Sequence, residues 1–174
     1  SHIRLTATEL QLVSAPAREK ILKKWIAKNM DVLGKYDYIV LDTNPSMGVV
    51  NQNAFMAADS IILVSDVSKK AIQGAQLFTY LWGEICESMD VEDNTKALIL
   101  NNCDKRIGLT ADIKEYYRDD EDFGRILMES TIPSRVDIKT TETKYLPINL
   151  TAPNSDACEA FRAVISELKE REVL

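Results

Sequence analysis

A single carboxylate follows the most strand-like run of this sequence. Residues 36–41 are almost all apolar or aromatic, and Asp42 comes directly after them. Such a run predicts a strand covered on both faces, and an acid at its carboxyl end could hold a magnesium-bound water. Pro45 lacks an amide proton and Gly48 permits positive φ, so residues 42–48 predict an irregular turn. Asp42 could equally cap that turn without taking part in any chemistry.

A second set of polar side chains follows another apolar run. Residues 101–104 read Asn-Asn-Cys-Asp and come after a predicted strand. An asparagine amide offers both a donor and an acceptor to the edge of a nucleotide base. The Asn-x-x-Asp spacing also occurs in the guanine-reading loop of GTPases and arises by chance, so Asp104 could simply fix the loop.

The predicted elements alternate along the chain. Apolar runs predict strands over residues 60–65, 96–101 and 126–131, in addition to 36–41, and helical spacing predicts helices over 69–89, 111–118 and 154–168. This order indicates an α/β fold with a doubly wound parallel sheet and helices on both faces. Asp42, Asp66 and Asn101 should then lie at one edge of the sheet.

Two further segments carry basic residues. Between residues 16 and 33, an apolar stripe that includes Trp25 predicts a helix packed on the core, with lysines on its solvated face. Residues 134–144 are basic and show no helical periodicity. We expect that stretch to be largely irregular.

Composition narrows the range of functions. The chain has 174 residues, a length that predicts one domain over residues 1–174, and a net charge of -6, so any nucleic-acid contact must be a local patch. Its three cysteines are widely separated, which predicts reduced, buried thiols rather than disulfides or a zinc site. The one histidine is His2, so no Ser-His-Asp triad can form. The apolar runs are shorter than the ~20 residues needed to cross a bilayer, so we expect a cytoplasmic protein without membrane contact.

Several segments, taken in order, resemble the ParA family of partitioning ATPases, relatives of MinD. The matching segments cover roughly residues 8–170 and comprise Asp42–Gly48, Asn53-Ala54, Ala57-Ala58-Asp59, residues 101–106, Thr131-Ile132-Pro133 and Pro147-Ile148. The first of them resembles the family's Walker B segment, D-x-P-P-S-x-G, with Asn44 in place of the first proline. The resemblance implies a P-loop NTPase-like fold.

The family's phosphate-binding loop is missing from this sequence. No G-x-x-x-x-G-K-[ST] pattern can be drawn through the six glycines. The chain therefore resembles the C-terminal two thirds of such an ATPase, with the N-terminal strand and phosphate loop absent. We expect Ser1 and His2 to be the remnant of an expression tag.

The resemblance also implies roles for individual residues. Asp42 would be the catalytic carboxylate that holds Mg²⁺ through water, while Pro45 and Gly48 would shape the turn that senses the γ-phosphate. Asn101 and Pro133 would contact the adenine of ATP.

Family members also bind DNA through basic residues near the segment that contains Pro133. The family wording I-P-R-N-V-R is here altered by Ser134 and Asp137, which replace two arginines. The DNA contacts would then come from Arg135, Lys139 and Lys144. A solvated basic loop is the alternative.

The expected function is therefore part of a ParA-like ATPase for partitioning plasmid or chromosomal DNA. In the full-length protein this implies ATP, Mg²⁺, an ATP-dependent homodimer, nonspecific DNA binding and a ParB-like partner protein. This chain alone lacks the Walker A lysines and is expected to be inactive. Two alternatives stay open: a nucleotide-free protein interaction module on the same fold, and a GTPase-like switch.

Overall fold

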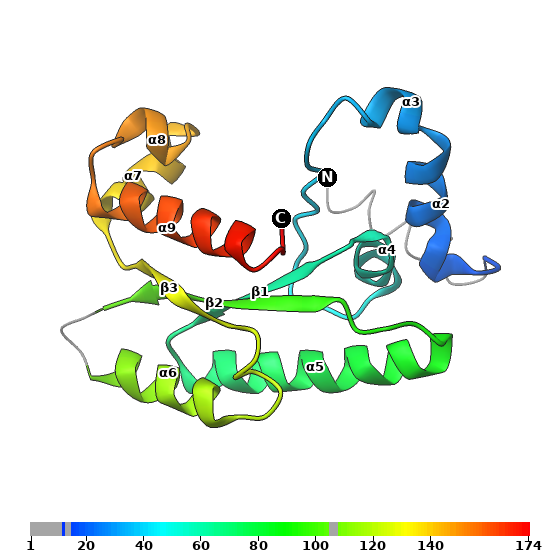
Figure 1. The fold of residues 1–174 in the computed structure, drawn as a ribbon, viewed down its shortest axis with the longest axis horizontal. Helices are drawn as coiled ribbons and strands as arrows, with labels where there is room; N and C mark the ends of the chain where they lie inside the picture. Colours follow the sequence, from blue (N-terminus) through cyan, green and yellow to red (C-terminus); the bar gives the residue numbers. More distant parts are fainter. Residues whose placement is uncertain (1–11, 13–14, 105–107) are drawn as a thin grey trace. The chain divides into compact units, whose positions relative to one another are not determined.

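Three strands form a parallel sheet in a computed structural model that describes residues 12, 15–104 and 108–174 (Figure 1). Their order is β1 (Ile61–Asp66), β2 (Thr95–Cys103) and β3 (Leu127–Pro133). Strand β2 pairs with β3 in parallel, with Leu98 opposite Leu127 and Cys103 opposite Pro133. The predicted α/β fold with a parallel sheet is confirmed.

Strand β2 is buried because its side chains feed two hydrophobic clusters in turn. Ala97 and Ile99 pack in one cluster with Met128, Val164 and Leu168. Leu98 and Leu100 pack in the other, whose members include Ile113, Tyr117 and Phe123. Successive residues of a strand point to opposite faces, so an uninterrupted apolar run needs cover on both sides of the sheet.

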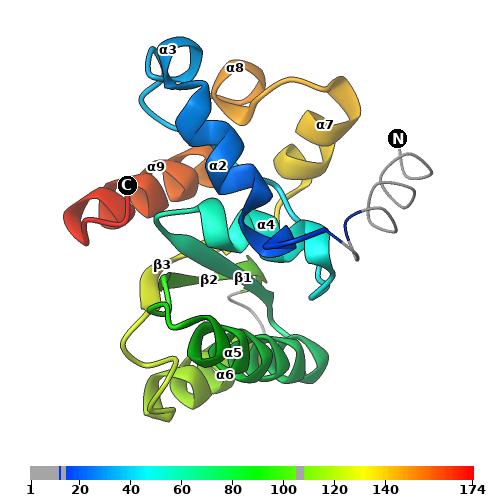
Figure 2. The same cartoon turned by 90° about the vertical axis from the view of Figure 1, so that its right-hand side faces the viewer.

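Helices supply that cover. Helix α6 (Leu109–Asp119) and the first turns of α5 (Lys69–Met89) lie on one face, whereas α9 (Asp156–Glu170) lies on the other (Figures 1 and 2). Two more helices, α7 (Val136–Lys144) and α8 (Ile148–Thr151), connect β3 to α9. The expectation of a doubly wound sheet holds for this part of the chain.

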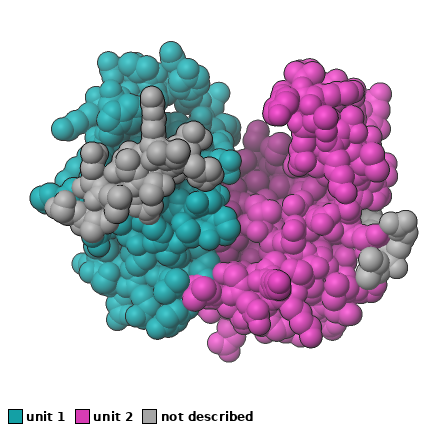
Figure 3. Space-filling model, turned by 180° about the vertical axis from the view of Figure 1, so that it is seen from behind, with its two compact units in different colours: residues 1–61, 78–94 teal, residues 62–77, 95–174 magenta. Residues whose placement is uncertain are grey.

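The chain divides into two compact units (Figure 3). Residues 1–61 and 78–94 form unit 1, whereas residues 62–77 and 95–174 form unit 2, which contains the sheet from residue 62 onward. Unit 1 contains η1 (Arg18–Lys20), α2 (Ile21–Lys28), α3 (Met30–Leu33), α4 (Val49–Ala57) and the second half of α5. Ser1 and His2 lie outside the described residues.

Unit 1 is held together by buried asparagine amides and an aromatic group. Asn53 donates to the carbonyl of Arg18 at 2.6 Å and accepts from the backbone N–H of Leu22 at 3.0 Å, which fixes η1 and α2 on α4. Phe55 makes edge-on contacts with Phe78 and Trp82, with ring centroids 5.4 Å apart in both cases. The Asn-Ala pair at 53–54 therefore has a clear structural role.

The strand expected over residues 36–41 is absent. Residues 36–48 form neither helix nor strand, and Val40 is 87% exposed. A strand needs a neighbour for its backbone N–H and C=O groups, and no described strand pairs with this segment. Asp42 therefore follows an exposed, extended segment of unit 1 instead of a strand of the sheet.

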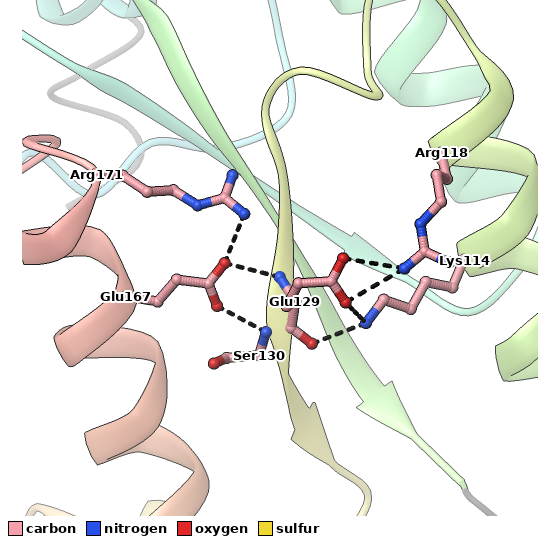
Figure 4. A network of polar contacts seen from close by, with 6 residues as sticks. All are labelled: Lys114, Arg118, Glu129, Ser130, Glu167 and Arg171. Carbon is pink, nitrogen blue, oxygen red and sulfur yellow. Dashed lines mark hydrogen bonds and ion pairs between the residues drawn. The ribbon is translucent and has the colours of Figure 1, made fainter.

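The two outer strands of the sheet differ in how their edges are covered. At β3, the carboxylate of Glu167 accepts the backbone N–H groups of Glu129 and Ser130 at 2.8 and 2.7 Å and pairs with Arg171 at 2.7 Å (Figure 4). At β1, Val64 is 65% exposed.

Two helical expectations were wrong in detail. Residues 136–144 form α7, although no apolar stripe marks them; Thr140 and Thr143 instead donate to the carbonyls four residues earlier. Helix α2 exists, but none of its residues is buried and Trp25 is 54% exposed, so the predicted core stripe covers α4 only partly. A short polar helix such as α7 leaves a weak periodic signal.

The prediction for the cysteines is confirmed. Cys86, Cys103 and Cys158 are all free and buried, as expected. Within the described residues, every helix is too short or too polar to cross a bilayer.

Candidate functional site

A pocket of about 220 Å³ lies where the strands of unit 2 end. The carboxyl ends of β1, β2 and β3 and the start of α7 form its wall. Its lining consists of Asp66, Asn101, Asn102, Pro133, Ser134, Arg135, Ile138, Lys139 and Glu142. Ligands of open parallel sheets bind outside the carboxyl ends of the strands, so this is the place where the fold itself favours a site.

A bulge at the end of β2 shapes the floor of the pocket. Asn102 has a φ of 57°, in the left-handed region, and the pairing of β2 with β3 shifts register between Leu100 and Cys103. Ser134 then donates its backbone N–H to the carbonyl of Cys103 at 2.9 Å. An extra residue of this kind redirects the neighbouring side chains, and asparagine tolerates the left-handed conformation well.

The side chains of Asn101 and Asp66 meet across the ends of β2 and β1. Nδ2 of Asn101 donates to Oδ1 of Asp66 at 3.3 Å. This contact orients the amide and leaves its Oδ1 as an acceptor. Pro133 is buried and offers an apolar ring beside it.

Helix α7 adds charges of both signs. Arg135 lies just before the helix, donates to the carbonyl of Ser134 at 3.1 Å and lies 3.6 Å from the carboxylate of Asp156. Lys139 and Glu142 are exposed and three residues apart, so they lie on the same side of the helix. The pocket therefore combines an oriented amide, two apolar side chains and mixed charge.

The size of the pocket limits what it can hold. Sites for drug-sized ligands usually measure about 300–1,000 Å³. A pocket of about 220 Å³ is smaller, and it fits a group the size of a nucleotide base better than a complete nucleotide.

Residues that the sequence assigned to two different ligands meet in this pocket. Asn101 and Pro133, expected at a nucleotide base, share its lining with Arg135 and Lys139, expected on DNA. Lys144 lies at the last position of α7 and does not line the pocket.

Sequence reasoning placed Asp66 at this edge of the sheet but did not select it as a site residue. It missed Ile138 and Glu142, which line the pocket only because residues 136–144 are helical. The spacing of 138, 139 and 142 matches one side of a helix and was the signal available.

The turn after Asp42 belongs to unit 1 and is firmly built. Nδ2 of Asn51 donates to the carbonyls of Asn44 and Ser46 at 2.7 and 2.8 Å. Gly48 precedes α4 with a φ of -62°, so the positive φ considered for it is not used. Asp42 and Pro45 are exposed.

A direct metal cluster is not found in the described part of the chain. No three His, Cys, Asp or Glu side chains converge there. Asp42 offers one exposed carboxylate.

Comparison with known proteins identifies similar chains. Residues 1–95 match the model of AAA_31, described as an AAA domain. The chain is 26% identical to the chromosome partitioning protein ParA of Myxococcus xanthus, over 97% of this chain and 58% of that protein. It is 25% identical to the sporulation initiation inhibitor protein Soj of Bacillus subtilis, over 95% of this chain and 64% of that protein. The chain thus spans about three fifths of the length of these relatives.

A solved structure shares the fold. The chain superposes on a Borrelia burgdorferi protein, described as a plasmid partition protein bound to AMPPNP, with a TM-score of 0.63. The alignment covers 91% of this chain and 57% of the other, at 18% sequence identity.

Proposed function

Because this chain belongs to the AAA_31 family of AAA domains and is similar to ParA and Soj, we propose that it is part of a cytoplasmic ATPase that partitions plasmid or chromosomal DNA. The observation that carries the proposal is the pocket at the carboxyl edge of the sheet, where Asn101, Asp66 and Pro133 come together. We propose that this pocket holds the adenine of ATP.

Three residues of the pocket have a defined part in this proposal. Asn101, oriented by Asp66 at 3.3 Å, accepts a hydrogen bond from the exocyclic amine of adenine through its Oδ1. Pro133 packs against the base. Bound ATP with Mg²⁺ would supply the phosphoryl group that is transferred to water.

The proposed roles of Asp42, Pro45 and Gly48, all in unit 1, come from the resemblance of residues 42–48 to a Walker B segment. Asp42 holds a water of the magnesium shell, a role that needs a carboxylate but no direct metal contact. Pro45 and Gly48 set the path of the turn, which Asn51 fixes from α4. In this proposal the turn responds to the γ-phosphate.

Nucleotide binding by single variants tests the base site. The 174-residue protein should bind ATP weakly, with a dissociation constant on the order of 1 mM, because a base contact alone contributes only about 4 kcal/mol. Asn101→Ala should weaken this binding about tenfold, measured by equilibrium dialysis, while Asn154→Ala, an exposed asparagine away from the pocket, should not change it. Tighter binding of GTP than of ATP would favour the GTPase reading, and no binding of either would favour an interaction module.

The proposal extends to DNA and to partners of the full-length protein. ATP would drive homodimer formation, and the dimer would bind DNA without sequence preference through Arg135, Lys139 and Lys144. A ParB-like partner protein would stimulate hydrolysis. Support for these steps comes from the relatives named ParA and Soj and from the basic side chains of α7.

A further inference from the structure

A buried pair of hydroxyl groups joins β1 to α6 next to the pocket of unit 2. Ser65 and Tyr117 are both buried, and their side-chain oxygens lie 2.8 Å apart. Ser65 is the one polar residue of the run 61–65, and it precedes Asp66, which lines the pocket. Buried polar groups cost free energy unless they are paired, so this contact holds β1 and α6 in one arrangement.

The protons of the two hydroxyl groups can be assigned from their partners. Oγ of Ser65 donates to the backbone carbonyl of Asp66 at 3.2 Å. A serine hydroxyl carries one proton, so Tyr117 is the donor in its contact with Ser65. Burial raises the pKa of Tyr117, which keeps the phenol protonated and able to donate. The hydrogen bonds therefore run in one direction, from Tyr117 through Ser65 to the carbonyl of Asp66.

The backbone of Asp66 is held from two sides. Its carbonyl accepts from the hydroxyl of Ser65 and from the backbone N–H of Ser68, the latter at 2.9 Å, so both of its lone pairs are used. The side chain of Asp66 is exposed, yet its Oδ1 accepts from Nδ2 of Asn101 at 3.3 Å. A fixed backbone lowers the entropic cost of ordering that carboxylate toward Asn101.

The ring of Tyr117 is fixed as well. It makes edge-on contacts with Phe123 and Tyr116, with ring centroids 5.2 and 5.8 Å apart, and it packs in the hydrophobic cluster that contains Leu98 and Leu100 of β2. A fully paired polar contact in such a core makes its surroundings rigid. The phenol is therefore a fixed point from which the end of β1 can be positioned.

We infer that Tyr117 and Ser65 are positioning residues of the pocket, which hold Asp66 and, through it, the side-chain amide of Asn101. Neither residue is among those that line the pocket, so both act through Asp66. The effect on nucleotide binding rests on the proposed function, whereas the effect on the amide of Asn101 needs no ligand. A pair that only stabilised unit 2 would leave the order of that amide unchanged.

The test uses the ¹⁵N-labelled 174-residue protein and two variants of the pair. Ser65→Ala removes the donor to Asp66 and also leaves the buried hydroxyl of Tyr117 unpaired, which lowers stability. The double variant, Ser65→Ala with Tyr117→Phe, removes both hydroxyl groups and leaves neither unpaired. Tyr116→Phe is the matched control, because it removes a hydroxyl of α6 that bonds to Gln76 instead.

Without nucleotide, the order parameter of the Asn101 side-chain amide should fall in both Ser65 variants and stay unchanged in Tyr116→Phe. Urea unfolding should show that the double variant recovers most of the stability lost in Ser65→Ala. An Asn101 amide as ordered in the double variant as in the wild type would overturn the inference, since the pair would then act on stability alone. The double variant decides the test if Ser65→Ala alone does not fold.

With ATP, the double variant should bind about threefold more weakly than the wild type, the scale of one hydrogen bond. The same double change added to Asn101→Ala should cause no further weakening, because the amide on which the pair acts is gone. An equal further loss in that background would overturn the inference. Absence of ATP binding by the wild type would contradict the proposed base site, and the order of the Asn101 amide would still decide the role of Tyr117 and Ser65.

Discussion

Asp42 and Asn101 have separate proposed roles, and each can be tested alone. Asp42 is exposed on a turn that Asn51 fixes through two carbonyls. Its role needs a phosphate-binding loop, which this sequence does not contain. The 174-residue protein should therefore show no ATP turnover above a protein-free blank.

A protein in which a ParA-type phosphate loop precedes this chain should hydrolyse ATP slowly. In that protein Asp42→Ala should lower turnover about 10- to 100-fold. This is the usual effect of removing a residue that holds a ligand of the metal and does not itself touch the metal. Asp59→Ala removes another exposed carboxylate and serves as the control. Wild-type turnover in Asp42→Ala, measured by phosphate release, would make the Walker B assignment wrong.

At the scale of residues, the sequence identified the polar side chains but not all their neighbours. Asn101 and Pro133 could be selected because each follows an apolar run, and strand ends meet at one edge of a parallel sheet. Glu142 was missed because its place in the pocket depends on a helix without an apolar stripe, so its spacing from 138 and 139 was the one signal for it.

One carboxylate, that of Glu167, covers part of the outer edge of β3. Glu167 has a side chain only 14% exposed and accepts two backbone N–H groups of the strand. Burial acts to raise the pKa of Glu167, but the N–H groups of Glu129 and Ser130, with Arg171 nearby, bring that pKa below its usual value. The ionised form therefore stabilises the folded protein.

Glu167→Gln should lower the free energy of unfolding by about 2 kcal/mol at pH 7, the usual scale for hydrogen bonds to a charged group. A lowered pKa in the folded state means that this contribution is complete above the unfolded pKa of about 4.3 and disappears as the pH falls through the folded value. Urea unfolding at pH 7, 5 and 3 measures it. Glu170→Gln, at an exposed position of the same helix, is the control. A difference between wild type and variant that persisted at pH 3 would contradict this account.

At the scale of elements, the sheet could be predicted and its exposed neighbours could not. Residues 97–100 are apolar without interruption, and they form a strand because two clusters accept their side chains. Residues 38–41 are also apolar without interruption, but no described strand pairs with them. An apolar run therefore predicts the capacity to form a strand, whereas pairing decides whether the strand forms.

At the scale of the whole molecule, overall charge and local basic residues oppose each other. With a net charge of -6, the 174-residue protein should bind duplex DNA negligibly at about 150 mM salt. The full-length, ATP-bound protein should bind, and combined alanine substitution of Arg135, Lys139 and Lys144 should weaken binding and reduce its salt dependence. Random-sequence DNA and a salt titration provide the measurement.

A variant at Lys144 can distinguish DNA binding from nucleotide binding among the basic residues at α7. Arg135 and Lys139 line the pocket, so their loss would also affect nucleotide binding, whereas Lys144 lies outside the lining. Lys144→Ala should weaken DNA binding and leave ATP binding unchanged. Identical slopes and affinities for wild type and the triple variant would show that these residues are only a solvated basic surface.

The central claim is that the pocket at the carboxyl edge of the sheet holds an adenine base. Nuclear magnetic resonance of the ¹⁵N-labelled 174-residue protein, titrated with ATP, tests it most directly. The account predicts saturating shifts in the amide signals of Asn101, Asn102 and Ser134, which GTP does not reproduce and which need about tenfold more ATP in Asn101→Ala. Shifts confined to other parts of the chain, or equal shifts with ATP and GTP, would contradict it.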